Sequence, residues 1–295
     1  MGDVLAGIHS SWEFDTDAVL IRFERGIRTP KLFHVLGERR IPYEALSSVE
    51  LTPGPRRGTV ALRAVPRPGA DPLLDAAGGQ LREAVDPYRL VLPAEREALA
   101  AYYATELQSA LGRDADLDAG YFMVPAPTAP LHFKAFDGKV SFDGKVVSFR
   151  WFWTGASSAK WKAGDQSFAV SELAGVDWRS PEAADGHLRL IRRGPDGKPE
   201  ESDSGEPADQ NPAAVVFGLG YGLVHESLPL AASVLEAVQA SEEDPCFPHP
   251  DSVRDARADP ADIAERIRHL GDLHTAGLLT RDEFTEKKRE LLAEL

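Results

Sequence analysis

Few residues in this sequence have the types and the spacing that catalysis or metal binding requires. Cys246 and His249 lie three positions apart in a proline-rich stretch, and the eight histidines are scattered along the chain. A structural zinc site needs about four such ligands, and a nucleophilic cysteine needs a base held beside it in a rigid pocket. We therefore interpret Cys246 and His249 as residues of a solvated linker and expect no metal site.

Two other motifs resemble the beginnings of ligand-binding loops without completing them. The glycine-rich run from Phe217 to Gly222 stands between an apolar segment and a helical one, but its spacing is wrong for a dinucleotide loop. It is typical of a last strand that bends towards a helix. Asp114, Asp116 and Asp118 alternate as in a calcium loop, but the glycine and the distal glutamate of such a loop are missing. The sequence indicates no catalytic residues and no cofactor, so we expect a protein that is not an enzyme.

The charge balance excludes one class of partner and leaves another open. The chain carries 33 basic and 47 acidic side chains, whereas a surface that binds nucleic acid needs an excess of Lys and Arg. Residues 1–112 are less acidic, with 13 basic and 15 acidic side chains. Their cations gather in expected turns: Arg22, Arg25, Arg28 and Lys31 around the first, and Arg39, Arg40, Arg56 and Arg57 in later ones. These cations either are simply solvated or make a weak contact with an anionic membrane surface.

Three consecutive aromatic residues, Trp151, Phe152 and Trp153, follow in the second half of the chain. Successive side chains of a strand point to opposite faces, so the three rings cannot all face one core. We expect at least one of them to be substantially exposed. An exposed ring is either covered by the neighbouring unit or forms a surface that binds a partner.

The elements that carry these residues form an internal repeat. Residues 41–51 align on residues 168–178 without a gap, at an offset of 127. Segments before and after this block match in the same order at nearly the same offset. We expect Leu46 to match Leu173, and Val49 to match Val176, in inward-facing positions. The chain therefore contains two units of the same fold.

Each unit is expected to be a small antiparallel sheet followed by one helix. Short apolar runs between Gly and Pro turns predict strands in the first unit at 19–23, 32–36, 48–51, 59–65 and 88–92. Apolar residues at spacings of three and four then predict one helix per unit. They are Leu99, Tyr102, Tyr103, Leu107, Ala110 and Leu111 within 95–111, and Leu230, Val234, Leu235 and Val238 within 228–240.

These units resemble pleckstrin-homology-like (PH-like) domains. The resemblance rests on Phe14-Asp15 before Val19, on Ile41-Pro42 before Leu46, and on the C-terminal helix of each unit. It implies an α+β fold of two tandem units, at 8–112 and 130–240, each an antiparallel β-sandwich or barrel capped by a C-terminal helix. The arrangement is similar to a bacterial family of unknown function built from two such units. Because eukaryotic PH domains bind phosphoinositides through basic residues near the first hairpin, Arg22, Arg25, Arg28 and Lys31 are candidate lipid-binding residues.

The end of the chain has a different character. Residues 241–258 are rich in proline and charge and are typical of a linker. Asp259 and Pro260 predict the start of a helix, Gly277 predicts its end, and Thr280 with Glu283 forms a capping box for a second helix. We therefore expect a small α-helical hairpin over 259–295. Its apolar stripe exceeds what two short helices can bury: Ile263, Ile267, Leu270, Leu273, Leu278, Leu279, Phe284, Leu291 and Leu292.

This segment resembles the short C-terminal domain known as SHOCT. The residues that carry the match are Ile267, Leu270, Leu273, the run from Ala276 to Thr280, Glu283-Phe284, Lys287-Lys288 and Leu291-Leu292. The resemblance implies oligomerisation or partner binding. A DNA-binding helix-turn-helix is disfavoured, because acidic residues outnumber basic ones here.

The expected setting is the cytoplasm. The sequence shows no signal peptide and no apolar stretch long enough to span a bilayer, and its single Cys excludes a disulfide framework. The leading hypothesis is a non-enzymatic scaffold or adaptor that forms a homo-oligomer through residues 259–295 or recruits a heterologous protein. The alternative is a peripheral membrane or lipid-binding module that uses the basic loops of the first unit.

Overall fold

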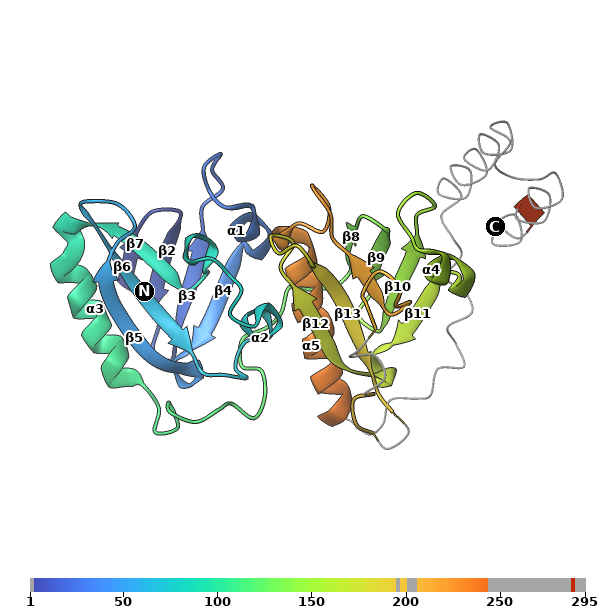
Figure 1. Ribbon diagram of the computed structural model, residues 1–295. Coiled ribbons are helices and arrows are strands. Elements are labelled where there is room, and N and C mark those ends of the chain that lie inside the picture. The colour runs from blue at the N-terminus through green and yellow to red at the C-terminus, as the bar shows by residue number, and fades with distance from the viewer. Residues whose placement is uncertain (1–2, 195–196, 201–205, 244–287, 290–295) are drawn as a thin grey trace. The chain divides into compact units, whose positions relative to one another are not determined.

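Figure 1 shows the computed structural model of the chain, which divides into two compact units, Met1–Phe247 and Pro248–Leu295. The structure describes residues 3–194, 197–200, 206–243 and 288–289. From here on, the first unit means Met1–Phe247. It contains both of the similar units expected from the sequence, which we now name repeat one (residues 3–110) and repeat two (residues 131–243). Residues 288–289, the described part of the second unit, are helical.

Repeat one consists of two antiparallel sheets and a C-terminal helix that enclose one core. The first sheet has the order β1-β2-β3-β4, from strands Asp3–Ala6, Ser10–Phe14, Ala18–Phe23 and Glu38–Pro42. The second has the order β5-β6-β7, from strands Leu46–Pro53, Thr59–Pro66 and Arg89–Pro93. The helices are α1 (Lys31–Leu36), α2 (Pro72–Ala77) and α3 (Glu97–Ala110), with 3-10 turns at Tyr43–Ala45, Glu83–Val85 and Ala94–Arg96.

Repeat two has the same two sheets and the same final helix. Its first sheet has the order β11-β10-β9-β8, from strands Leu131–Lys134 (β8), Gly138–Phe142 (β9), Val146–Trp151 (β10) and Gln166–Ala169 (β11). Its second has the order β12-β13-β14, from Leu173–Arg179, His187–Arg192 and Ala214–Val216. Helix α4 spans Ser158–Ala163, a 3-10 turn spans Val170–Glu172, and α5 spans Val224–Glu243.

The predicted correspondence of the repeats is confirmed residue by residue. Leu46 begins β5 and Leu173 begins β12, and both side chains are fully buried. Val49 and Val176 follow three positions later and pack against the core of their own repeat. Each of the two strands also carries a β-bulge directly after its first residue. A shared irregularity at matched positions shows that the two halves have one backbone design.

One predicted strand of repeat one is wrong. Residues 32–36 form helix α1, and the fourth strand of the sheet is β4, at 38–42. The burial pattern explains the difference, because the adjacent residues Leu32 and Phe33 are both buried, as on a helix and not as on an alternating strand. A short apolar run does not distinguish the two structures by itself.

The predicted apolar face of α3 is also partly wrong. Tyr103 and Leu107 are buried together with Ala100, but Leu99 and Tyr102 are exposed. Two overlapping stripes run along this helix, and the core takes the one that begins at Ala100. In α5 the prediction holds for Leu230, Val234 and Val238, which are buried. Helix α5 continues to Glu243, so the first three residues of the predicted linker belong to it.

Each repeat has its own apolar core, and residues of repeat one complete the core of repeat two. Helix α2 of repeat one packs on α5 of repeat two, and three of its residues, Leu73, Ala76 and Ala77, belong to the core cluster of repeat two. Polar contacts fix the same boundary. The side-chain amide of Gln80 donates to the carbonyl of Trp178 at 3.1 Å and accepts from the amide of Ser180 at 2.9 Å. These contacts therefore join the two repeats into one compact unit.

A buried ionic network holds α2 on repeat one. Asp71 caps α2 by accepting from the amide of Leu73 at 2.8 Å, and the same oxygen accepts from the guanidinium of Arg39 at 2.8 Å. Tyr88 accepts from Arg39 at 2.9 Å and donates to the other oxygen of Asp71. Burial raises the pKa of Tyr88 well above its usual value, so the phenol keeps the proton that it donates. Burial alone would lower the pKa of Arg39, but Tyr88 and Asp71 more than offset this and the pKa is raised.

Replacing Arg39 should destabilise the fold far more than replacing its neighbour on β4. Arg39→Met leaves Asp71 buried without a cation and should lower the free energy of unfolding by about 3–5 kcal/mol. Arg40→Met is the matched control, because Arg40 and its partner Asp17 are exposed, so only a small change is expected. Urea unfolding of the two full-length variants measures both effects. Equal losses would contradict a central role for the buried network.

Candidate interaction surface

Both repeats place a turn and a loop side by side at one end of the first sheet. In repeat one the amide of Glu24 donates to the carbonyl of His9 at 2.9 Å, which ties the loop after β3 to the β1–β2 turn. In repeat two the amide of Phe152 donates to the carbonyl of Asp137, also at 2.9 Å. The two bonds are equivalent at an offset of 128. We name this end of both repeats the loop edge.

The turn before α5 belongs to the same edge. The amide of Gly222 donates to the carbonyl of Lys134 at 2.8 Å, and the backbone of Gly218 lies against the ring of Phe136. In Figure 1 this turn, the loop after β3 and the loop after β10 all rise along the upper side of the two repeats. The loop edge is therefore defined as residues 7–9, 24–31, 135–137, 152–157 and 217–223.

Contacts between α1 and α5 join the two halves of the loop edge. Lys31 begins α1, and His225 lies in the first turn of α5. Burial lowers the pKa of His225, and the charge of Lys31 lowers it further. Lys31 of repeat one therefore stands close to the elements of repeat two that carry the turn 217–223.

The loop after β3 presents an apolar tip. Its base is held by Thr29, which is buried, donates its amide to Gly26 at 3.0 Å, and places its hydroxyl 3.2 Å from Nδ1 of His9. Above this base Ile27 is fully exposed, at 106% of its reference area. Single exposed apolar side chains are ordinary on protein surfaces, so Ile27 by itself marks no binding site.

The four cations named as lipid-binding candidates separate into two groups. Arg22 lies on β3 and forms ion pairs with Glu13 and Glu38, so neighbouring carboxylates already balance its charge. Arg25, Arg28 and Lys31 belong to the loop edge and are exposed. Among the described residues these three form no ion pair. Arg22 differs from the other three cations in having ion-pair partners, and lipid binding by the four stays a prediction.

The cations of the later turns also fall into two groups, one held by carboxylates and one exposed in a turn. Arg39 is buried in the core and Arg40 pairs with Asp17, so neither is an open contact. Arg56 and Arg57 are exposed in the turn between β5 and β6. Figure 1 shows that this turn lies along the upper side of repeat one as well.

The aromatic run of repeat two has an exposed ring as predicted, but the reason is different, because β10 ends at Trp151 and the two following rings lie in the loop after it. Trp151 is buried, Phe152 is half-buried and Trp153 is 40% exposed, which confirms that at least one ring reaches solvent. Trp153 packs edge-on against Trp161 of α4, with ring centroids 4.7 Å apart. Its neighbour Gly155 has no room for a Cβ, because one would lie 2.2 Å from the carbonyl of Phe136. That the exposed ring binds a protein partner stays a prediction.

Three other large apolar side chains are exposed on the loop edge of repeat two. Phe136 is 50% exposed, Tyr221 is exposed, and Leu219 is fully exposed at 102%. The sequence predicts a bend over Phe217–Gly222 but gives no sign that Leu219 is exposed there. The bend is confirmed, since a bridge between Gly218 and Tyr221 closes it as a tight turn.

A buried ion pair lies beneath the loop edge of repeat two. No pattern in the sequence predicted it. Lys160 of α4 is fully buried, and its ammonium lies 2.5 Å from Asp137 and 4.9 Å from the centre of the Trp151 ring. Asp137 also accepts from the amide of Val216 at 2.9 Å. Burial raises the pKa of Asp137 and lowers the pKa of Lys160, and their attraction opposes both shifts. A lysine among apolar neighbours in a short helix gives little sign of this role in the sequence.

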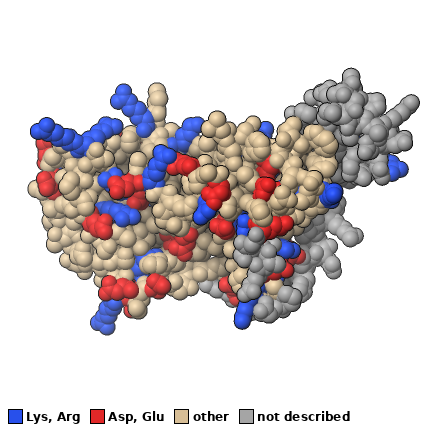
Figure 2. Space-filling view, in the orientation of Figure 1, with Lys and Arg blue, Asp and Glu red and all other residues tan. Residues whose placement is uncertain are grey.

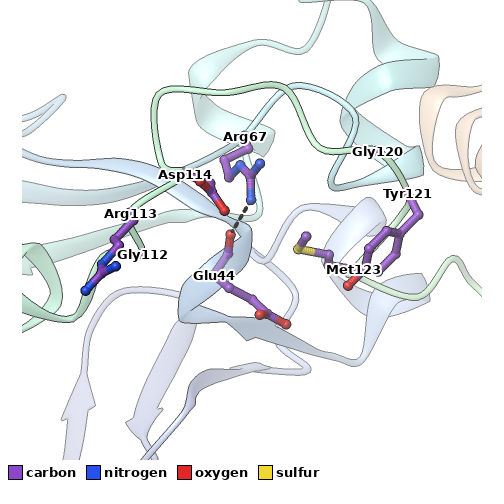
Figure 3. A pocket seen from close by; sticks show the side chains of 8 residues that line it. All are labelled: Glu44, Arg67, Gly112, Arg113, Asp114, Gly120, Tyr121 and Met123. Atoms are coloured by element: carbon purple, nitrogen blue, oxygen red, sulfur yellow. Dashed lines mark hydrogen bonds between the residues drawn. The ribbon is translucent and has the colours of Figure 1, made fainter.

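A pocket of about 420 Å³ lies away from the loop edge, where the connector after α3 passes over repeat one (Figure 3). Arg67 stands at its back and donates to the carbonyls of Glu44, Leu117 and Asp118 at 2.8–3.2 Å. These bonds use the guanidinium to hold the connector. Arg113 and Asp114 at the rim are exposed. The pocket is therefore the space left where the connector packs against repeat one.

Other sequence candidates add no site. Asp114, Asp116 and Asp118 lie in the connector, and within the described ranges no group of three or more potential ligands is placed to hold a metal ion. The helices among the described residues are all too short or too polar to cross a bilayer. Cys246, His249 and the nine hairpin residues (Ile263, Ile267, Leu270, Leu273, Leu278, Leu279, Phe284, Leu291 and Leu292) lie outside the described residues.

The fold and the loop edge define a tandem-repeat α+β protein. A family model described as "Domain of unknown function (DUF4429)" matches the chain twice, over residues 12–108 and 140–235. The chain belongs to this family, and each match falls within one repeat. No curated protein matches the chain.

The buried pair of repeat two should behave as a unit. Lys160→Met leaves Asp137 in the core without its cation and should lower the free energy of unfolding by about 3–5 kcal/mol. Adding Asp137→Asn removes the unpaired charge and should recover part of that loss. Urea unfolding of wild type, both single variants and the double variant measures the coupling. Strictly additive losses would show that the two groups do not depend on each other.

Proposed function

We propose that the protein is a non-enzymatic adaptor that self-associates, or recruits a protein partner, through residues 259–295. The observation that carries the proposal is the packing of α2 of repeat one into the core of repeat two. Because Leu73, Ala76 and Ala77 complete the core of repeat two, the tandem is a rigid platform. A rigid platform joined to a separate C-terminal unit suits a protein that holds other molecules in fixed relation.

The buried ionisable groups support a structural role over a chemical one. Arg39, Asp71 and Tyr88 satisfy one another inside repeat one, and Lys160 and Asp137 do so inside repeat two. Groups that carry out catalysis must reach a substrate from a pocket. These networks are enclosed, so their effect is to fix the helices that they join.

We propose in addition that each repeat is PH-like and that residues 259–295 form a SHOCT-like hairpin. The four-stranded sheet, the three-stranded sheet and the closing helix support the first part. The spacing of apolar residues and caps in the sequence supports the second. A hairpin of this length buries its stripe only against another surface, and the preceding proline-rich segment is long enough to let it reach one. A cytoplasmic setting is part of this proposal.

Removing the C-terminal segment should lower the mass of the particle in solution. The shortened chain 1–258 keeps the whole first unit, so its repeats should remain folded while self-association is lost. Light scattering on the full-length and shortened proteins measures the two masses. The full-length double variant Leu270→Asp/Leu291→Asp should match the shortened chain, because charges in the stripe oppose its burial. Equal monomer masses for all three proteins would remove self-association, and an affinity pull-down that also captures no protein would contradict the adaptor.

A further inference from the structure

We propose that the pocket beneath the connector after α3 binds a small zwitterion of the amino-acid class, with its carboxylate on Arg67 and its ammonium group beside Glu44 and Asp114. The proposal goes beyond the adaptor function, since it concerns a pocket of repeat one and not residues 259–295. The pocket has a volume of about 420 Å³, and sites for small molecules commonly measure about 300–1,000 Å³. A single amino acid with an aromatic side chain therefore fits within it.

The guanidinium of Arg67 carries a charge that no carboxylate balances. Arg67 is only 8% exposed. Its Nε and Nη2 donate to the carbonyls of Leu117 and Asp118, and its Nη1 donates to the carbonyl of Glu44, at 2.8–3.2 Å. These acceptors are neutral, and no Asp or Glu side chain of the described ranges forms an ion pair with Arg67. A buried charge without a counter-ion is costly, so an anion that enters the pocket is attracted to it.

The remaining donors of Arg67 match the acceptors of a carboxylate. A guanidinium has five N–H bonds, and the three bonds to carbonyls leave one N–H on each Nη. Two such donors bind both oxygens of one carboxylate at once. Because the three carbonyls already hold the guanidinium in place, little side-chain freedom is lost when the carboxylate binds.

Two acidic side chains of the lining disfavour a ligand that carries negative charge alone. Figure 3 shows Asp114 beside Arg67, Glu44 next to them, and Arg113 pointing away from the other lining side chains. Glu44 and Asp114 are exposed, and neither has an ion-pair partner in the part of the chain that the structure describes. They repel a second negative group of a ligand and attract an ammonium group.

The surface around the pocket has the same sign of charge as these two side chains. Figure 1 shows the connector along the lower side of repeat one, and Figure 2 shows mainly Asp and Glu side chains there. A surface of this kind repels multiply charged anions such as phosphate before they reach Arg67. A zwitterion has no net charge and is not repelled. The lining therefore favours separated charges of both signs over phosphate or a dicarboxylate.

The side of the pocket opposite Arg67 is apolar. Figure 3 shows Tyr121 and Met123 there. Tyr121 is 51% exposed and Met123 is half-buried, so both present apolar surface to the pocket. An aromatic ring and a thioether pack well against apolar and aromatic groups. The side chain of a bound amino acid therefore lies against Tyr121 and Met123, and its two charged groups lie against the opposite side.

Contacts with both repeats hold this apolar side in place. The amide of Met123 donates to the carbonyl of Ala70 at 2.9 Å, and the amide of Phe122 donates to the side-chain oxygen of Gln239 on α5 at 2.8 Å. The site therefore exists only while the connector is packed on the folded first unit. A ligand that binds there should raise the temperature of unfolding.

Isothermal titration calorimetry of the full-length protein with L-phenylalanine tests the proposal. We expect a Kd of about 1 mM or lower and a rise in the unfolding temperature. Phenylalaninamide lacks the carboxylate and N-acetylphenylalanine lacks the ammonium group, so each should bind about 10-fold more weakly or not at all. Absence of binding by L-phenylalanine would overturn the proposal. Equal binding of either analogue would overturn it as well, because the corresponding charge would have no partner in the pocket.

Variants of exposed residues locate the ligand. Glu44→Gln should weaken binding of L-phenylalanine about 3- to 10-fold, because it removes a charge that attracts the ammonium group. Tyr121→Ala should weaken it by a similar factor of about 3 to 10, because it removes the aromatic contact. Glu95→Gln is the matched control, since Glu95 is exposed before the start of α3, and binding should stay within about twofold. Circular dichroism should show an unchanged fold for all three variants.

The weak binding of N-acetylphenylalanine provides a crossed control. It should fall further in Tyr121→Ala and stay the same in Glu44→Gln, because this analogue keeps the ring and has no ammonium group. If Glu44→Gln and Glu95→Gln bound L-phenylalanine equally well, or if Tyr121→Ala had no effect, the ligand would not lie in this pocket and the proposal would be overturned.

Discussion

The carboxylate of Asp71 is the point on which the first unit depends. One of its oxygens caps α2 and binds Arg39, and the other binds Tyr88. Arg39 comes from β4 of the first sheet, and Tyr88 directly precedes β7 of the second, so one buried group joins both sheets to α2. Helix α2 in turn completes the core of repeat two. A charge that is costly to bury thus fixes the element that unites the repeats, and this gives the ion pair a role in specifying the arrangement.

The two repeats share one backbone arrangement, but different side chains occupy matched positions of their cores. In repeat one Phe23 stacks on Phe33 with ring centroids 4.6 Å apart. The matched positions of repeat two hold Trp151 and Lys160, and the contact becomes a cation–π pair at 4.9 Å. A buried lysine requires a carboxylate, and Asp137 supplies it from the position that matches His9. The substitution therefore changes three positions together, while the loop that they support keeps its hydrogen bond to the same turn.

Elements whose apolar residues recur at regular spacing were predicted correctly from the sequence. Contacts that depend on one side chain and a partner far away in the chain were not. The repeat, four of the seven strands of repeat one and both closing helices follow from apolar spacing, and the match of Leu46 with Leu173 is seen in the structure. Helix α1 was missed because five apolar-rich residues fit a strand equally well. By sequence Arg39 groups with the loop cations, because no residue near it in the chain indicates a buried partner. Its partner Asp71 lies 32 residues further along the chain. Long-range pairs of this kind arise from the fold, so local patterns cannot supply them.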